Sequence, residues 1–396
     1  MVGYLAIFFF AQSPFREVPY AVKLETIMEH DDGKFLWYHP RAASFPNPDG
    51  NSPRVLMTLQ KHLRTSDHYS GLFTMERAAP GGEWSPPAER PELAWRSVGE
   101  VDVAVADVTP GWHPQTKKLL AIGAEVRYSR AGKQLEDVPR SNQTAYAVYD
   151  PAKRTWSGWK RLEMPPGSEF NFARSACSQW LVRPDGKLLL PFYFGPSQTE
   201  RFRATVVEAS FDGETIKHLR QGTEFRLEVV RGLAEPSIAE HRGRWFLTVR
   251  NDLAGYVSSS ADGLAFAPLR KWTFDDGKDL GSYNTQQHWL SRPDGLFLIY
   301  TRRGANNDHI IRHRAPLFIA QVDPEKFRVV RRTERILIPE RGGEFGNFGA
   351  GPIDENESWV TVGEGVWSDS DRKRGARGAL YVARILWNAP AAKGGP

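Results

Sequence analysis

Two stretches of this chain are nearly copies of each other: Trp180-Leu-Val-Arg-Pro-Asp-Gly-Lys-Leu-Leu-Leu190 and Trp289-Leu-Ser-Arg-Pro-Asp-Gly-Leu-Phe-Leu-Ile299. Each reads as a strand, a tight Asp-Gly turn and a second apolar strand, because Asp-Gly between such runs is a strong hairpin signal. Looser copies have their turns near residues 33, 117, 243 and 356. A hairpin that repeats in this way indicates an array of similar units.

A further β-like run follows each hairpin, which gives six units of at least three strands with room for a fourth. Six four-stranded units predict an all-β, six-bladed β-propeller, because propeller blades are four-stranded sheets around a central channel. A β-sandwich or a pair of β domains is the alternative. We expect one domain over residues 18–388, with residues 18–27 supplying a strand that closes the ring with the last blade. The runs that follow the hairpins are 68–76, 144–150, 203–211, 255–261, 315–323 and 378–385.

Composition limits the function only mildly. The 52 Lys and Arg residues exceed the 47 Asp and Glu residues by five and are spread along the chain. We therefore expect no nucleic-acid partner, and the short basic run 371–374 reads as a surface loop. The 13 tryptophans suit β-rich packing and carbohydrate stacking equally. Cys177 is the only cysteine, so no internal disulfide forms, and we expect it in the core.

The N-terminal residues 1–17 contain a short apolar run that ends in Ala11-Gln-Ser13 but has no basic start. We interpret this run as a clipped or atypical signal peptide, which predicts a secreted or periplasmic protein. No segment is long enough to span a bilayer. Residues 389–396 are rich in Ala, Gly and Pro and read as a flexible tail.

One hairpin carries a charge pair at its open end. Its turn is centred on Arg242-Gly243, and Glu235 and Arg250 are equally far from that centre. They are therefore predicted to be cross-strand partners on one face. The pair either stabilises the sheet by roughly 0.2–1 kcal/mol or faces the propeller axis, where ligands commonly bind.

The same segment resembles the middle of a sialidase (neuraminidase). In that family a Glu-Pro-Ser strand, a hairpin, an Arg-Asn end and an Asp-box follow one another, as 235–237, 250–251 and Ser260-Ala-Asp-Gly263 do here. Sialidases are six-bladed propellers, which agrees with the number of units. The other Asp-boxes (BNR repeats) are eroded, and Arg-Pro-Asp-Gly replaces them.

The resemblance implies a set of three arginines that binds a carboxylate. Arg41 would be the first, Arg250 the second and Arg314 the third, with Arg302, Arg303 and Arg312 as neighbours that could replace the last. Guanidinium groups suit this role because they are always charged and bind carboxylates through two parallel hydrogen bonds.

The resemblance also implies two catalytic carboxylates. Asp67 matches the loop aspartate that acts as general acid/base in the family, and Glu235 matches the glutamate that activates its tyrosine nucleophile. His62 and His68 flank Asp67 and titrate in a range that lets them share the proton transfer.

The chain departs from the family at the nucleophile. The stretch that should begin the last blade with a tyrosine reads Gly346-Asn-Phe348-Gly-Ala-Gly351, and phenylalanine has no hydroxyl. Tyr283 opens the preceding blade and is the candidate to replace the tyrosine from there, with Gln287 and His288 as substrate-binding candidates beside it.

Three chemistries remain open. Glu235 or Asp67 activates water in an inverting hydrolase, or His39, the other histidines and Tyr283 serve a uronate lyase, or the propeller binds sugar without catalysis. We expect an exo-acting glycoside hydrolase whose partner is a terminal acidic, sialic acid-like sugar, with no cofactor. The cluster Asn306-Asn-Asp-His309 reads as a hydrogen-bonded loop rather than a metal site.

Overall fold

A computed structural model describes residues 15–47, 50, 52–64, 67–78, 81–135, 142–197 and 201–387. Within these residues the chain is all-β, apart from four short 3₁₀ turns and the six-residue helix α1 (Asp369–Arg374). The apolar N-terminal run and the C-terminal tail fall mostly or wholly outside the described residues. No helix in the described part of the chain is long and apolar enough to cross a membrane.

The two ends of the described chain meet in one sheet. Strand β1 pairs antiparallel with β29, so the strand order is β1-β29-β28-β27. The predicted closing strand is thereby confirmed, although it begins and ends about two residues later than the sequence suggested. Its bounds and those of its partners are β1 Tyr20–Glu29, β27 Gly349–Pro352, β28 Glu357–Gly363 and β29 Ala379–Trp387.

Two further sheets are antiparallel meanders of four strands each. Both run outward from an inner strand, β2 in one and β17 in the other. The first comprises β2 Leu36–Phe45, β3 Arg54–His62, β4 Phe73–Ala78 and β5 Ala88–Glu89, and the second β17 Ala234–His241, β18 Arg244–Arg250, β19 Gly255–Ser260 and β20 Arg270–Lys271.

A six-stranded sheet contains the second of the two near-identical hairpins, formed by β22 and β23. The strand β24 follows, and β25 and β26 both pair with it. The strands are β21 Thr273–Phe274, β22 His288–Arg292, β23 Gly295–Tyr300, β24 Leu317–Asp323, β25 Arg328–Val329 and β26 Arg335–Ile338.

The largest sheet joins two meanders. The first is built on β7, β8 and β9 and the second on β13 to β16, and a short parallel pairing of β12 with β9 connects them. The strands are β6 Arg96–Val98, β7 Val101–His113, β8 Lys118–Ser129, β9 Asn142–Asp150, β10 Thr155–Trp156, β11 Lys160–Arg161, β12 Phe172–Arg174, β13 Leu181–Val182, β14 Leu188–Gly195, β15 Arg203–Phe211 and β16 Ile216–Gln221.

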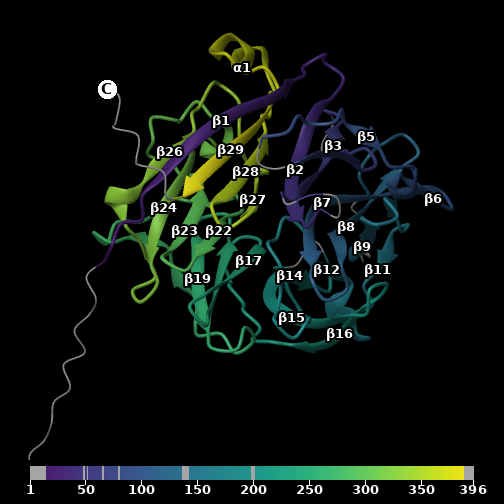
Figure 1. Cartoon of the computed structure of the whole chain (residues 1–396), viewed down its shortest axis with the longest axis horizontal. Coiled ribbons are helices and arrows are strands. Elements are labelled where there is room, and N and C mark those ends of the chain that lie inside the picture. Colours follow the sequence, from purple (N-terminus) through teal and green to yellow (C-terminus); the bar gives the residue numbers. More distant parts are fainter. Residues whose placement is uncertain are drawn as a thin grey trace, which may run out of the picture.

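The sheets are arranged around one axis, with their inner strands toward the centre (Figure 1). Strand β2 contacts both β7 and β27, and β22 contacts both β17 and β27. The hairpin of β13 and β14 contacts β7 on one side and β17 on the other, so the inner strands form a closed ring. Apolar side chains fill the spaces between neighbouring sheets, as Phe297 and Val360 do between β23 and β28. The fold is therefore propeller-like, and the sandwich alternative is wrong.

Five of the six predicted hairpins form, but the turn near residue 33 joins β1 and β2, which pair with β29 and β3 in different sheets, so the prediction of a hairpin there is wrong. The turns of the hairpins that form also differ. Arg242 and Gly243 both have positive φ (52° and 77°), as a two-residue turn of this kind requires. In the Pro184-Asp185-Gly186 turn only the glycine is left-handed, because proline fixes φ near −65° and starts a different turn type.

Candidate active site

A repeated irregularity in the inner strands turns side chains toward one end of the axis. Strands β2, β7 and β17 lose register at His39, Asp107 and Glu235, each of which adopts a positive φ of 47–60°. Cys177 and Asn284 hold the same conformation in the segments before β13 and β22. Bulges of this kind re-aim a side chain, and strained backbone of this kind is concentrated at functional sites.

Four of these five residues line a cavity of about 480 Å³. The cavity is strongly charged and receives side chains from segments that are far apart in the sequence. Its lining includes Asp67, Tyr69, Asp107, Arg174, Cys177, Tyr193, Arg231, Glu235, Arg250, Asp252, Asn284, Arg312, Arg314 and Asn347.

The predicted charge pair of the fourth hairpin lies in this cavity. Arg250 Nη1 lies 2.5 Å from Glu235 Oε1, and Arg250 Nη2 donates to Asn284 Oδ1 at 2.6 Å. The Cα partner of Arg250 is Ala234 rather than Glu235, because the bulge at Glu235-Pro236 shifts the register by one residue. The predicted ion pair is therefore present, although the strand register is not the one expected.

Four guanidinium groups form what we call the arginine wall: Arg231, Arg250, Arg312 and Arg314. Arg231 makes a two-pronged pair with Asp252, at 2.7 and 2.9 Å. Arg314 donates to the carbonyl oxygen of Asn284 at 2.7 Å and lies 3.6 Å from Glu344. Three of the four arginines therefore have a carboxylate within 4 Å.

Arg312 differs from the other three. Among the described residues, its guanidinium makes no hydrogen bond or ion pair with a neighbour. Burial, together with repulsion from Arg314, Arg250 and Arg231, lowers the pKa of Arg312. Asp252, Glu235 and Glu344 lie within 4 Å of the other three guanidinium groups, so Arg312 is the one arginine of this wall without a carboxylate partner among the described residues.

The opposite wall is built around Asp107. His39 Nε2 and Arg174 Nη2 lie 2.9 and 3.2 Å from its two carboxylate oxygens, and Cys177 Sγ donates to it at 2.9 Å. Burial alone would raise the pKa of Asp107, but His39, Arg174 and Arg41 outweigh burial and hold that pKa far below its usual range. We call this group the aspartate cluster.

The sequence analysis did not identify Asp107, Arg174 or Cys177 as site residues. A signal existed: Asp107 interrupts the apolar run of β7 as Glu235 interrupts that of β17, and His39 interrupts that of β2. A polar residue that interrupts the apolar run of an inner strand, compared between repeats, would have found Asp107; Arg174 ends β12 and Cys177 lies outside the strands, so neither carries this signal.

Asp67 lies at the cavity wall as the loop residue after β3. Tyr69 points its hydroxyl toward Asp67 Oδ1 at 3.5 Å, and Tyr128 donates to the carbonyl oxygen of Asp67 at 2.9 Å. Burial raises the pKa of Tyr69 and of Tyr193, which also lines the cavity, so both hydroxyls keep their protons.

Arg41 does not line this cavity. It lies two residues beyond His39 in the same inner strand, and its Nη2 donates to Gln286 Oε1 at 3.3 Å. It is 2% exposed, and a Cβ on Gly349 would lie 2.7 Å from its Cγ, so the glycine leaves room for it. The bulge in β2 falls at His39-Pro40, so His39 rather than Arg41 occupies the position equivalent to Asp107 and Glu235.

The remaining candidates lie around the cavity and do not line it. His62 and His68 pack among aromatic rings, and Gln287 bonds Thr248 and Ser282 inside the fold. His288 bonds Ser237 and the carbonyl oxygen of Phe348. Tyr283 contacts His313 Nδ1 at 2.5 Å, and Arg303 lies over its ring.

The start of the last sheet presents Asn347, not Phe348, to the cavity. Phe348 is fully buried, and its carbonyl oxygen accepts a hydrogen bond from Gln286 Nε2 at 2.6 Å. Neither residue carries a hydroxyl, so these two residues supply no counterpart of the tyrosine nucleophile. Tyr38 lies behind it and hydrogen-bonds Glu344.

The cluster at 306–309 stabilises its own loop through hydrogen bonds. Asn307 Nδ2 donates to the carbonyl oxygens of Arg302 and Ala315 at 2.9 and 2.6 Å. Within the part of the chain that the structure describes, no three His, Cys, Asp or Glu side chains form a group able to hold a metal ion.

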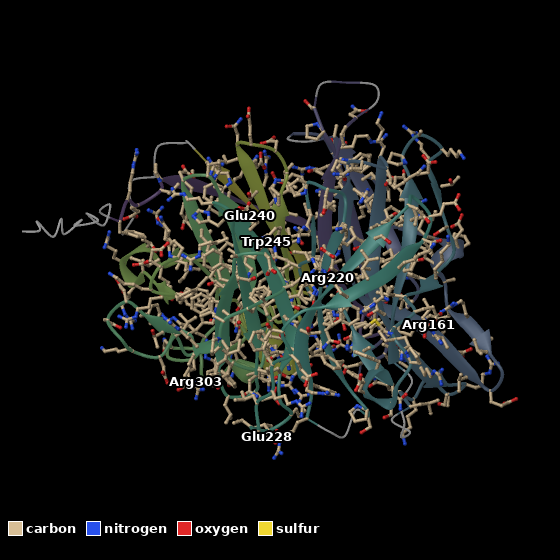
Figure 2. The ribbon with its side chains drawn as sticks, turned by 90° about the horizontal axis from the view of Figure 1, so that it is seen from below. Arg161, Arg220, Glu228, Glu240, Trp245 and Arg303 are labelled. Carbon is tan, nitrogen blue, oxygen red and sulfur yellow. The ribbon has the colours of Figure 1, made fainter. Side chains whose placement is uncertain are left out.

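A second, larger cavity of about 840 Å³ opens at the other end of the axis, and its lining includes Glu240, Trp245, Arg41 and His288. Figure 2 shows Glu240 and Trp245 toward one end of the sheets and Glu228 and Arg303 toward the other. Glu235 lines the charged cavity and Glu240 lines the larger one from opposite ends of strand β17, so the two cavities lie at opposite ends of the ring. They also differ in charge, because the walls of the larger one are mainly apolar.

Comparison with known proteins supports the fold, but it does not assign the chain to a family or an activity. No protein-family model and no curated protein matches the sequence. A mutant of Trypanosoma rangeli sialidase with trans-sialidase activity matches the structure with a TM-score of 0.59 at 12% identity, over 93% of this chain and 60% of that one. The NanB sialidase of Streptococcus pneumoniae matches with 0.59 at 12%, over 92% and 70%.

A Penicillium chrysogenum α-L-arabinanase complexed with arabinobiose matches with a TM-score of 0.56 at 12% identity, over 92% of this chain and 97% of that one. This chain thus spans about 60% of the length of the T. rangeli protein but nearly all of the arabinanase. The protein has an all-β, propeller-like fold similar to that of sialidases and shared with other glycoside hydrolases.

Proposed function

We propose that this chain is a six-bladed propeller and a glycoside hydrolase that removes a terminal acidic, sialic acid-like sugar. The two meanders of the largest sheet count as two blades, which β12 connects. One observation carries the function: the arginine wall converges on a concave cavity and keeps one positive charge without a carboxylate. A sugar carboxylate supplies the missing charge, bound by Arg250, Arg312 and Arg314.

The two carboxylates expected for catalysis both line the cavity. Glu235 pairs with Arg250 at 2.5 Å inside the cavity, so we assign it the activation of water. Asp67 donates a proton to the leaving oxygen. Because Asn347 stands where a tyrosine nucleophile was expected, water attacks the anomeric carbon directly and the configuration inverts.

A uronate lyase is the second candidate. A lyase requires an acid for the leaving oxygen, and the hydroxyls of Tyr69 and Tyr193 lie at the cavity wall in their protonated form. His62, His68 and His288, which we considered as lyase bases, do not line the cavity, and His39 is held by Asp107.

One experiment separates these functions. The protein is incubated with a sialoside and with uronate polysaccharides, and free sugar and new ultraviolet absorbance are measured. We expect free sugar without absorbance, lost in Arg250→Ala and kept in Arg303→Ala, whose arginine lies outside the cavity. New absorbance would identify a lyase, and saturable binding without product a non-catalytic propeller.

Export is part of the proposal. It rests on the apolar N-terminal run at 1–13, and deletion of residues 1–17 should keep the protein inside the producing cell. Full-length protein that also stays inside would contradict export.

A further inference from the structure

The larger cavity, of about 840 Å³, has an exposed end and a buried end. Pro184 and Gly243 line it from hairpin turns and are exposed to solvent. Arg41 and His288 also line it, but they are only 2% and 1% exposed. The cavity therefore opens among the hairpin turns and ends at Arg41 and His288, and its volume is in the range of small-molecule sites.

The walls of this cavity are built mainly from aromatic and aliphatic side chains. Four tryptophans reach it from four different segments of the ring, and two leucines, a valine and an isoleucine lie between them. Such walls favour an apolar ligand, because burying apolar surface away from water is favourable. The residues are Trp112, Trp180, Trp245, Trp289, Leu181, Leu290, Val182 and Ile238.

Most polar groups at the buried end already have partners within the protein. Trp180 Nε1 donates to the carbonyl oxygen of Thr109 at 3.1 Å, and Trp289 Nε1 donates to that of Ser237 at 3.0 Å. Both ring nitrogens of His288 have hydrogen-bond partners as well. A neutral sugar would bury many hydroxyls here without partners, which is costly, so the tryptophans alone do not indicate a sugar site.

Arg41 is the exception at the buried end. Its Nε is buried and has no hydrogen-bond partner among the residues that the structure describes. Its other two nitrogens donate only to neutral oxygens, the Val108 carbonyl at 3.4 Å and Gln286 Oε1 at 3.3 Å. Both distances are long for hydrogen bonds of this type, so the guanidinium group is weakly satisfied by the protein.

The charge of Arg41 is also without an ion-pair partner in the described part of the chain. Asp107 is near enough for Arg41 to help lower its pKa, but the two oxygens of Asp107 contact His39 and Arg174. A buried charge without a hydrogen-bonded partner of opposite sign is costly. A carboxylate would complete Arg41, because guanidinium groups bind carboxylates through strong, charge-assisted hydrogen bonds.

We propose that the larger cavity binds an elongated aliphatic carboxylate, the chemistry of a medium-chain fatty acid. The carboxylate accepts hydrogen bonds from Arg41 at the buried end, and the aliphatic chain extends between the tryptophans toward the hairpin turns. This site lies at the opposite end of the ring from the arginine wall and does not depend on the proposed hydrolysis.

A homologous series of ligands tests the chemistry. Binding of hexanoate, octanoate and decanoate to the full chain is measured by calorimetry, with octan-1-ol and octylammonium as charge controls. We expect affinity to rise about two- to four-fold per methylene. Octanoate should bind about ten-fold more tightly than octan-1-ol, and octylammonium should not bind. Affinity that is independent of chain length, or equal for octanoate and octan-1-ol, would overturn the proposal.

Gly351 offers a way to fill the cavity. It lines the cavity, its φ lies outside the left-handed region, and a Cβ there would meet only the carbonyl oxygen of Ala42, at 3.8 Å. Gly351→Leu should therefore abolish octanoate binding. Gly158→Leu is the matched control, because a Cβ there would meet only the carbonyl oxygen of Glu92, at 3.9 Å, away from the cavity. Octanoate binding that survives Gly351→Leu would contradict the site.

Two arginine variants locate the carboxylate. Arg41→Met should weaken octanoate binding about ten-fold and leave octan-1-ol binding unchanged. Arg183 also lines the cavity, but it lies 3.5 Å from Glu208, so Arg183→Met should change neither affinity. Equal losses in both variants would place the carboxylate at the exposed end and overturn the role of Arg41. If Arg41→Met does not fold, the comparison of octanoate with octan-1-ol tests the same charge in the parent protein.

The last comparison separates this site from the charged cavity and from a sugar site. Octanoate should still bind to Arg250→Ala; binding lost there but kept in Gly351→Leu would place the carboxylate on the arginine wall and overturn the proposal. Maltotriose should not bind, and maltotriose binding that Gly351→Leu abolishes, without octanoate binding, would identify a neutral sugar site instead. None of these readouts uses sugar release, so the two proposals fail separately.

Discussion

Each wall of the charged cavity contains a carboxylate on a bulge with positive φ, but the two carboxylates have different partners. On the arginine wall, Glu235 projects from a bulge and engages Arg250, yet Arg312 keeps its charge unpaired. In the aspartate cluster, Asp107 projects from an equivalent bulge and is enclosed by His39, Arg174 and Cys177. Both carboxylates project from equivalent bulges, so their position in the ring does not distinguish them. The walls differ in whether an arginine, Arg312, is left without a carboxylate partner. In the proposed function the arginine wall binds an anion, whereas Asp107 in the aspartate cluster is already paired within the protein.

The largest expected effect comes from removing the arginine at the centre of its wall. Arg250→Ala should reduce sugar release by roughly 10²–10³-fold, because it removes a charged donor and leaves Glu235 unpaired. It should also cost about 3 kcal/mol of unfolding free energy, since both partners are mostly buried. Steady-state kinetics and denaturant unfolding measure the two effects, and activity within two-fold of the parent would place the site elsewhere.

On the other wall, Asp107→Asn should act mainly on stability and its dependence on acid. The pKa of Asp107 is lowered in the folded protein, so its contribution is fully present above the unfolded pKa of about 3.9 and is lost as pH falls below it. We expect a loss of about 2–3 kcal/mol at pH 7 that shrinks below pH 4. Melting temperatures of both proteins from pH 7 to 3 check this; parallel curves would show that Asp107 is not ionised in the fold.

The buried His288 should make the protein lose stability at a higher pH than Asp107 does. Burial and the nearby Arg41 lower the pKa of His288 to about 3, so it stays neutral in the fold but gains a proton on unfolding below about pH 6.5. Stability is therefore complete above that pH and falls toward pH 3, by roughly 2 kcal/mol at pH 5.

His288→Gln should remove this part of the pH dependence, whereas a variant of the surface residue His309, which pairs with Glu340, should not. Unfolding free energies at pH 7.5 and 5.0 give the comparison. An unchanged difference between the two pH values in His288→Gln would contradict the assignment.

The smallest effect is expected at Val230, the exposed residue before Arg231. Val230→Gly should raise the unfolding free energy by about 1 kcal/mol, because glycine tolerates a positive φ at no steric cost. Thermal unfolding measures the change. A clear loss of stability would mean that packing of the valine side chain outweighs the strain of its positive φ.

The sequence predicted the repeated architecture because hairpin signals are local and the closing strand was recognisable. It predicted the pair of Glu235 and Arg250 because both lie on one hairpin with a two-residue turn. It did not predict that Arg41 lies outside the charged cavity, because the bulge at His39-Pro40 changes which side chains face the cavity and no local signal marks that bulge. Asp107 and Arg174 were missed because their meeting depends on a parallel contact between two blades, which strand periodicity does not report.

The most direct measurement is a crystal structure of the protein soaked with N-acetylneuraminate and, separately, with glucuronate. We predict that the sugar carboxylate lies within hydrogen-bond distance of Arg250, Arg312 and Arg314, with the anomeric carbon toward Glu235. Sugar bound only in the larger cavity beside Trp245, or a carboxylate directed away from the arginine wall, would contradict an anion-binding active site at this end of the ring.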